Sequence, residues 1–171
     1  VNSLVQTLAA MNPDVMITPL AQRLDDDTAK AWVSKADVVL DCSDNFATRF
    51  ELNQACVAAK KPLVSGAAIR TEGQVIVFDS RNAASPCYRC LYDDGSSDSQ
   101  LSCSESGVLA PMVGVIGSVQ AMEAIKLILG AGKPPLGKLV HDDALNTEFR
   151  NINLRKDPQS PLCGDNPTVT D

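Results

Sequence analysis

The stretch DVVLDCSDN, residues 37–45, decides the fold class. Its first part is a short, nearly continuous run of β-branched and apolar residues, which is typical of a strand buried on both faces of a parallel sheet. Residues 45–60 follow at once with apolar positions at helical spacing, and residues 62–68 (PLVSGAA) form another buried run. A strand, a helix and a second strand in this order predict a parallel α/β unit.

The segment before residue 37 extends this pattern. Residues 2–12 and 26–36 have helical spacing, and residues 14–20 (DVMITPL) are predicted to form a strand. The alternation of strands and helices over residues 14–68 predicts a Rossmann-like, doubly wound α/β sheet.

After residue 68 the predicted strand pairing changes from parallel to antiparallel. Only Ile69–Glu72 separates the strand over 62–68 from the next run, GQVIVFD, which is too short for a helical crossover. This pair is therefore expected to be antiparallel, which makes the sheet only partly parallel, with antiparallel strands on its C-terminal side. The remaining predicted elements are a strand over 73–79, a helix from Pro111 to about Leu129, a hairpin over 139–145 and 148–155, and a loose tail from 157.

Composition narrows the function classes. The chain has 171 residues, a formal net charge of −6 and 44% hydrophobic residues, which excludes a disordered chain and argues against nucleic acid as a partner. The longest apolar stretch, Val108–Met122, is shorter than the ~20 residues of a membrane span, and no signal peptide is visible, so a cytoplasmic protein is expected. A single His, His141, excludes a metal site built from several histidines.

The first candidate site lies at the carboxyl end of the strand over 37–42, where open α/β sheets bind ligands. Asp44 can hold Mg²⁺ against nucleotide phosphates, because hard cations prefer carboxylate oxygen. Asp44 can instead be the N-cap of the following helix, and spacing alone favours this capping role.

Cysteines form the second and third candidates. Cys87 and Cys90 are spaced C-x-x-C, which supplies half of a tetrahedral zinc site, and Cys163 is the one later cysteine that could join them. A second knuckle would need a cysteine at position 160, where Ser160 stands; a redox pair and unlinked thiols remain alternatives. Cys103 lies in a polar loop before the long helix, where it could be a nucleophile or an idle surface thiol. Cys42 and Cys56 are expected to be buried structural thiols.

Taken in order, four stretches resemble the ThiF/MoeB/HesA family of ubiquitin-activating-enzyme-like adenylyltransferases. They are DVVLDCSDNFATR (37–49), PLVSGAAIRTEGQV (62–75), PCYRCL (86–91) and SGVLAPMVGVIGSVQAMEAIK (106–126). The resemblance covers residues 1–164, leaving 165–171 as a flexible tail, and the second stretch is closest to the molybdopterin-synthase branch.

The resemblance implies a reaction and its parts. Such enzymes transfer AMP from ATP to the C-terminal Gly-Gly carboxylate of a small β-grasp sulfur-carrier protein, in molybdenum-cofactor or thiamine biosynthesis, and they form homodimers. Asp44 then matches the aspartate that holds Mg²⁺·ATP and Asn45 a neighbouring nucleotide contact. Cys103 matches the cysteine used for a covalent link to the carrier or a sulfur donor. Cys87, Cys90 and Cys163 match three of the four Zn²⁺ ligands.

The chain departs from the family in one large respect. The family's Gly-rich nucleotide loop, G-x-G-x-x-G, and its Arg and Lys phosphate clamps are not in this sequence, which begins at Val1 in what looks like a later crossover helix. The chain is therefore expected to be an incomplete domain without the N-terminal nucleotide-binding half, and inactive alone. Two other functions stay open: a carrier-binding module without enzymatic activity, and a generic nucleotide-binding Rossmann domain.

Overall fold

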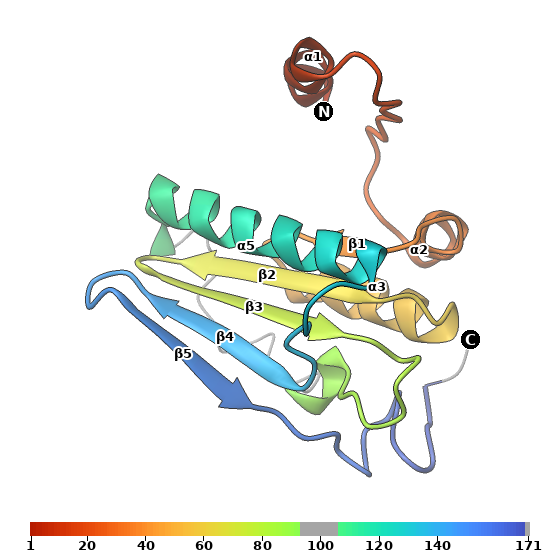
Figure 1. Cartoon of the computed structure of the whole chain (residues 1–171). Helices are drawn as coiled ribbons and strands as arrows, with labels where there is room; N and C mark the ends of the chain where they lie inside the picture. Colours follow the sequence, from red (N-terminus) through yellow and green to blue (C-terminus); the bar gives the residue numbers. More distant parts are fainter. Residues whose placement is uncertain (93–105, 170–171) are drawn as a thin grey trace.

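The computed structural model describes residues 1–92 and 106–169 and contains one five-stranded mixed sheet with the strand order β1-β2-β3-β4-β5 (Figure 1). The strands are β1 (Val39–Asp41), β2 (Leu63–Ile69), β3 (Glu72–Phe78), β4 (Lys138–Asp143) and β5 (Glu148–Asn153). The helices are α1 (Asn2–Met11), α2 (Asp26–Val33), α3 (Phe46–Ala58), the 3₁₀ turn η1 (Tyr88–Cys90) and α5 (Ala110–Leu129).

Strand directions confirm the predicted mixed sheet. β1 and β2 are parallel, with Asp41 opposite Ser65, and α3 connects them. β3 is antiparallel to β2, β4 to β3 and β5 to β4, so the final hairpin is also confirmed. The tight β2–β3 turn places Arg70 at a φ of 53°, in the left-handed region.

Two helical layers cover the sheet, and the alternation of residues along β2 and β3 assigns their side chains to separate cores. Val64, Val75 and Val77 pack with Met112 and Ile116 of α5 on one face. On the other face, α2 and α3 pack against the intervening residues of β2 and β3. The buried members of this second core are Ala29, Val33, Ala55, Cys56, Leu63, Ile76, Phe78, Tyr88 and Leu139. Figure 1 shows α5 and α3 on opposite faces of β2.

The ends of α5 are those that the sequence predicts. Pro111 lies in its first turn, and Gly130 ends it in the left-handed conformation, with a φ of 61°. The helix has 20 residues and is apolar enough to pass a length-and-composition test for a membrane span, so the expectation from the shorter stretch Val108–Met122 is wrong on this point. That test is weak evidence, because core helices of soluble proteins pass it too, and α5 packs on β2 and β3.

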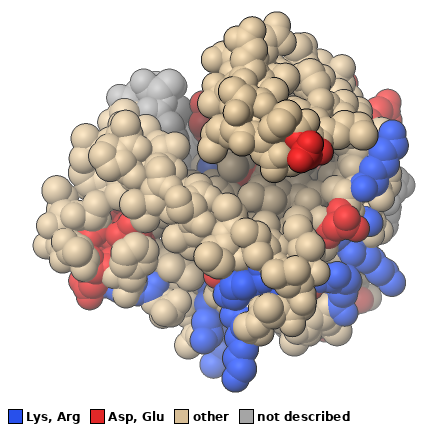
Figure 2. Space-filling view, turned by 45° about the horizontal axis from the view of Figure 1, so that its top comes forward, with Lys and Arg blue, Asp and Glu red and all other residues tan. Residues whose placement is uncertain are grey.

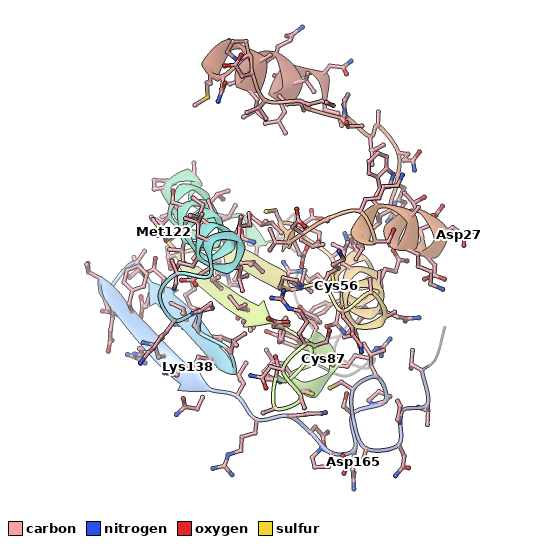
Figure 3. All side chains as sticks on the ribbon, turned by 45° about the vertical axis from the view of Figure 1, so that its right-hand side comes forward. Asp27, Cys56, Cys87, Met122, Lys138 and Asp165 are labelled. Atoms are coloured by element: carbon pink, nitrogen blue, oxygen red, sulfur yellow. The ribbon has the colours of Figure 1, made fainter. Side chains whose placement is uncertain are left out.

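The N-terminal segment departs from the prediction. Residues 14–20 form no strand, because a strand requires a neighbour for its backbone groups and this segment pairs with none among the described residues. β1 is consequently an edge strand, and Leu40 is 40% exposed rather than buried on both faces. α1 buries no residue, and Figures 1 and 3 both show it standing away from the sheet.

The segment after β5 is more ordered than its composition predicts. Backbone hydrogen bonds join Ser160 to Asp157, Gly164 to Ser160 and Asp165 to Pro158, and Ser160 is fully buried. The loose tail predicted from residue 157 is therefore wrong. The domain boundary at 164 stays a prediction.

Candidate functional site

The carboxyl end of β1 is built around the buried carboxylate of Asp41. One of its oxygens accepts hydrogen bonds from the Ser43 N–H at 2.9 Å and the Ser43 hydroxyl at 2.6 Å. The other accepts from the Ser65 hydroxyl on β2 at 3.0 Å. Because these donors satisfy Asp41, the loop leaving β1 is held in one conformation, and this fixes where Asp44 emerges.

Asp44 emerges from this loop with an exposed side chain. Asn45, not Asp44, is the N-cap of α3, and its side-chain oxygen accepts from the Thr48 N–H at 2.9 Å. The capping role that spacing favoured for Asp44 is therefore wrong. Among the described residues, the Asp44 carboxylate accepts a hydrogen bond from the Asn45 amide at 3.4 Å and its side chain is exposed, so its oxygens remain accessible to a cation.

Arg49 is a buried cation one turn into α3. Its guanidinium donates to the Ser43 carbonyl at 2.6 Å, to the Gly66 carbonyl at 3.4 Å and to the Tyr88 hydroxyl at 3.4 Å. Burial acts to lower its pKa, but Tyr88 and Asp41 outweigh burial and raise the pKa above its ordinary value. A permanent positive charge thus lies beneath the strand end, where a negative ligand is expected.

Gln120 fastens α5 to the same edge of the sheet. Its side-chain NH₂ donates to the Asp41 carbonyl at 2.8 Å and to the Val64 carbonyl at 3.1 Å. The helix approaches closely because residue 66 is glycine: a Cβ there would lie 2.2 Å from the Gln120 side chain. This polar residue in an apolar helix therefore belongs to the strand-end site.

Gly66→Ala should lower the free energy of unfolding by about 1–3 kcal/mol, because the new methyl group displaces the Gln120 amide from both carbonyls. Gly114→Ala is the matched control, since a Cβ at that position in α5 meets nothing within 4 Å. That control should be neutral or stabilise by up to about 1 kcal/mol through helix propensity. Urea denaturation of both variants measures the difference, and equal stabilities would contradict the close approach.

A cluster of three thiols lies beside η1, which packs against α3. Cys87 is the N-cap of η1 and Cys90 is its last residue, with their sulfurs 4.0 Å apart, and the Cys163 sulfur is 3.4 Å from that of Cys90. Tetrahedral Zn²⁺ with bonds of about 2.3 Å to sulfur separates its sulfur ligands by about 3.8 Å. The three sulfurs lie within 4.8 Å of one another, so together they could hold a metal ion.

Ser160 occupies the fourth corner. Its hydroxyl oxygen lies 3.6 Å from the Cys87 sulfur and 3.5 Å from the Cys163 sulfur. A tetrahedral ion with one oxygen ligand at about 2.0 Å requires an oxygen–sulfur separation of about 3.5 Å. These two separations suit an oxygen ligand, and the departure at position 160 replaces a thiolate by a weaker ligand.

Hydrogen bonds prepare one thiol of the cluster for ionisation. Hydrogen bonds with the Cys163 and Cys87 thiols lower the pKa of Cys90 despite its burial, and backbone N–H groups of Asp157 and Cys87 add to this effect. A thiolate is the form that binds metal, so this arrangement suits a metal ligand.

Tyr88 connects the thiol cluster to the strand end. It lies between Cys87 and Cys90 in sequence and is buried against the rings of Phe50 and Phe78. Its N–H donates to Asn53 at 2.9 Å, and burial raises the pKa of its hydroxyl to about 12, so the hydroxyl that faces Arg49 stays neutral.

The predictions for the other three cysteines have different outcomes. Cys103 lies outside the described residues. Cys56 is buried, as predicted, and burial raises its pKa to about 12. Cys42 is exposed, contrary to the prediction, because it follows the last residue of an edge strand.

Comparison with known proteins places these features in a family. A model of the ThiF family matches residues 1–164. The chain is 49% identical over 164 residues to the molybdopterin-synthase adenylyltransferase of Escherichia coli (strain K12), covering 96% of this chain and 65% of that protein. It is 43% identical over 159 residues to the sulfur carrier protein ThiS adenylyltransferase of the same strain, covering 93% of this chain and 62% of that protein. The chain thus spans slightly less than two thirds of these relatives.

Solved structures agree on the fold. The crystal structure of Escherichia coli MccB superposes with a TM-score of 0.77 at 19% identity, covering 98% of this chain and 50% of the other. The MccB structure with ATP gives the same TM-score and identity, with 95% and 50% covered.

Proposed function

Because the chain belongs to the ThiF family, we propose that it forms part of the active site of an ATP-dependent adenylyltransferase. Its substrate would be the C-terminal Gly-Gly carboxylate of a small β-grasp sulfur-carrier protein. The relatives named for molybdopterin synthase and for the sulfur carrier ThiS support this substrate class. The higher identity to the former favours a carrier of molybdenum-cofactor biosynthesis.

The position of Asp44 carries the proposal. An exposed carboxylate stands at the carboxyl end of a parallel strand, while its neighbour Asn45 takes the capping role. Nucleotide phosphates bind at such an edge, and a hard cation between carboxylate and phosphate is the usual bridge. Asp44 would hold that Mg²⁺, and Asn45 would lie beside the nucleotide.

The chemistry needs little from titratable side chains. A carboxylate oxygen of the carrier would attack the α-phosphorus of ATP, forming an acyl–phosphate bond while the bond to pyrophosphate breaks. The nucleophile is already ionised, so no general base is required. Bound Mg²⁺ would offset the charge of the leaving pyrophosphate. Arg49 would hold the Ser43 carbonyl, and with it the loop that presents Asp44.

We also propose Zn²⁺ for the thiol cluster, with Cys87, Cys90 and Cys163 as ligands and Ser160 completing the tetrahedron. The metal would join the 157–165 loop to η1 and have a structural role, since η1 packs against α3. Serine is a weaker ligand than thiolate, so affinity should be below that of a four-cysteine site.

Ser160→Cys should therefore tighten zinc binding by about tenfold or more, the equivalent of about 1.4 kcal/mol. Competition with a coloured chelator gives the affinities, and Cys90→Ser, which removes a thiolate, should weaken binding. Ser34→Cys is the control, because Ser34 is exposed at the end of α2, where its hydroxyl donates to the Ala31 carbonyl. Less than a tenth of a zinc ion per purified chain would reject the site.

Cys103 is proposed as the thiol that links covalently to the carrier or to a sulfur donor, a role that rests on the family resemblance alone. Its alkylation rate can be compared with that of Cys56, whose raised pKa makes it unreactive at neutral pH. A Cys103 thiol as slow as Cys56 would contradict the role.

For partners we propose the carrier protein and a second copy of the chain. The outer face of α5 exposes Val113, Met122, Ile125, Ile128 and Leu129, and an apolar face of this kind marks contact with protein. Figure 2 shows large uncharged areas on one side of the surface. Neither nucleic acid nor membrane is among the proposed partners, and the proposed location is the cytoplasm.

A chimera tests the enzymatic function. Residues 1–164 replace the matched part of the Escherichia coli molybdopterin-synthase adenylyltransferase, and ATP–pyrophosphate exchange is measured with a Gly-Gly-ended carrier. We expect exchange by the chimera and none by the 171-residue chain, which contains no Gly-rich nucleotide loop. Carrier binding that is independent of nucleotide, without exchange by the chimera, would favour a binding module instead.

A further inference from the structure

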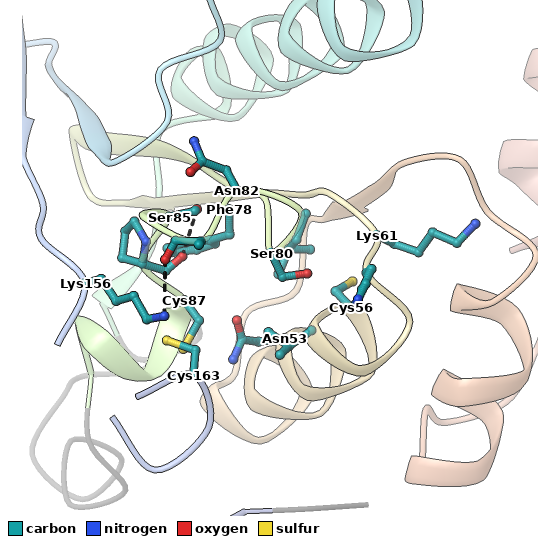
Figure 4. A pocket seen from close by; sticks show the side chains of 15 residues that line it. Asn53, Cys56, Lys61, Phe78, Ser80, Asn82, Ser85, Cys87, Lys156 and Cys163 are labelled. Atoms are coloured by element: carbon teal, nitrogen blue, oxygen red, sulfur yellow. Dashed lines mark hydrogen bonds between the residues drawn. The ribbon is translucent and has the colours of Figure 1, made fainter. Parts of the chain in front are cut away.

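A second pocket lies away from the strand end, between the last turns of α3, the loop after β3 and the C-terminal segment (Figure 4). Its volume is about 240 Å³, far more than a single water molecule needs. Asn53, Ser80 and Lys156 contribute one side chain each from these three parts of the chain. Asp44 precedes the opposite end of α3, so the pocket is separate from the proposed nucleotide site.

Two polar atoms in the pocket wall are buried without a partner in the described part of the chain. They are the side-chain nitrogen of Asn53 and the hydroxyl of Ser80. Asn53 is 1% exposed and its oxygen is already used by the Tyr88 N–H, so the amide is fixed and its NH₂ donors have no acceptor. Buried donors of this kind are normally satisfied, so water or a ligand with acceptor oxygens would complete their hydrogen bonding.

Lysine side chains in the pocket wall add positive charge near these donors. Lys60, Lys61 and Lys156 line the pocket, and none of the lining residues is acidic. The Lys156 ammonium donates to the Ala83 carbonyl at 3.2 Å, which holds it beside the pocket, whereas Figure 4 shows Lys61 extending away from Asn53 and Ser80.

Cys87 and Cys163 of the thiol cluster also line this pocket, so the charge of the proposed zinc site counts together with that of the lysines. Zn²⁺ with three thiolates would carry a net charge of −1, against the two ammonium groups of Lys60 and Lys156 when Lys61, which extends away, is left out. A positive surplus therefore remains for a ligand.

We propose that this pocket binds a small tetrahedral oxyanion of the phosphate type. The donors come from three separate parts of the chain, and they combine one amide, one hydroxyl and ammonium groups, which are the partners that the oxygens of a tetrahedral anion accept from. The site is independent of adenylylation and of Asp44.

Titration of the ¹⁵N-labelled chain with inorganic phosphate tests the proposal by NMR. The side-chain amide resonances of Asn53 should shift saturably, whereas those of Gln54, which does not line the pocket, should not. Chloride at matched ionic strength should leave both unchanged. Equal shifts with chloride would overturn the proposal, and tighter binding of acetate than of phosphate or sulfate would overturn the tetrahedral assignment.

Variants identify the donors. Lys156→Ala and Ser80→Ala should each weaken phosphate binding, the former by about tenfold because a charge-assisted hydrogen bond is lost. Lys133→Ala, an exposed lysine beyond the end of α5, should leave it unchanged. Unchanged affinity in both pocket variants, or equal weakening by Lys133→Ala, would overturn the site.

Discussion

Asp44→Asn should reduce ATP–pyrophosphate exchange by the chimera about 100-fold or more. The substitution keeps the size of the side chain and its distance from Asn45, but it removes the charge that would hold Mg²⁺ against the phosphates. A loss of about 3 kcal/mol of transition-state stabilisation corresponds to a factor of this size. Initial rates at saturating ATP, measured over a range of Mg²⁺ concentrations, give the effect.

Asp37→Asn is the matched control for this substitution. Asp37 is also exposed and adjoins the other end of β1, so the variant changes net charge equally without touching the proposed site. It should retain exchange within about twofold, and both variants should unfold at the same temperature. A full rate in Asp44→Asn would refute the role of this carboxylate.

Arg49→Met should lower the free energy of unfolding by about 3 kcal/mol or more. The apolar side chain has a similar volume but leaves the Ser43 and Gly66 carbonyls without their donor and the Asp41 carboxylate without a nearby cation. For a chain of this length the melting temperature should fall by roughly 10 °C.

An exposed arginine supplies the comparison. Arg150 on β5 pairs with Glu148, and both side chains are about half exposed. Arg150→Met should therefore cost no more than about 1 kcal/mol. If calorimetry gave equal losses for the two variants, the buried network around Arg49 would not be a stabilising feature.

Local pattern predicts most elements of this fold because it reports which residues become buried. Gly130 ends α5 as expected, and the short link after Ile69 forces an antiparallel pair. The segment 14–20 has the apolar content of a strand, but a strand also needs a neighbour, and periodicity carries no information about neighbours. Composition predicts a loose segment over 157–164 for the same reason. It does not reveal the contact between the Asp157 N–H and the Cys90 sulfur of η1, which is far away in sequence.

The candidate site was predictable where chemistry depends on residue type. The spacing of Cys87 and Cys90 indicated a metal knuckle, and the structure brings Cys163 and Ser160 to the remaining corners. Arg49 and Gln120 were missed, because a polar residue inside a helical repeat does not reveal whether it faces solvent or a buried carbonyl. The polar interruption of an apolar helix at Gln120 was the available signal.

Tyr88 links the thiol cluster to the loop that follows β1. Its backbone belongs to the turn between Cys87 and Cys90, and its hydroxyl accepts from the guanidinium that holds the Ser43 carbonyl. Metal at the proposed zinc site and nucleotide at the proposed strand-end site would then be coupled through Tyr88, and a coupling free energy between two binding sites is reciprocal. Any factor by which zinc strengthened nucleotide binding would equal the factor by which nucleotide strengthened zinc binding, so zinc affinity would become a readout of the distant site.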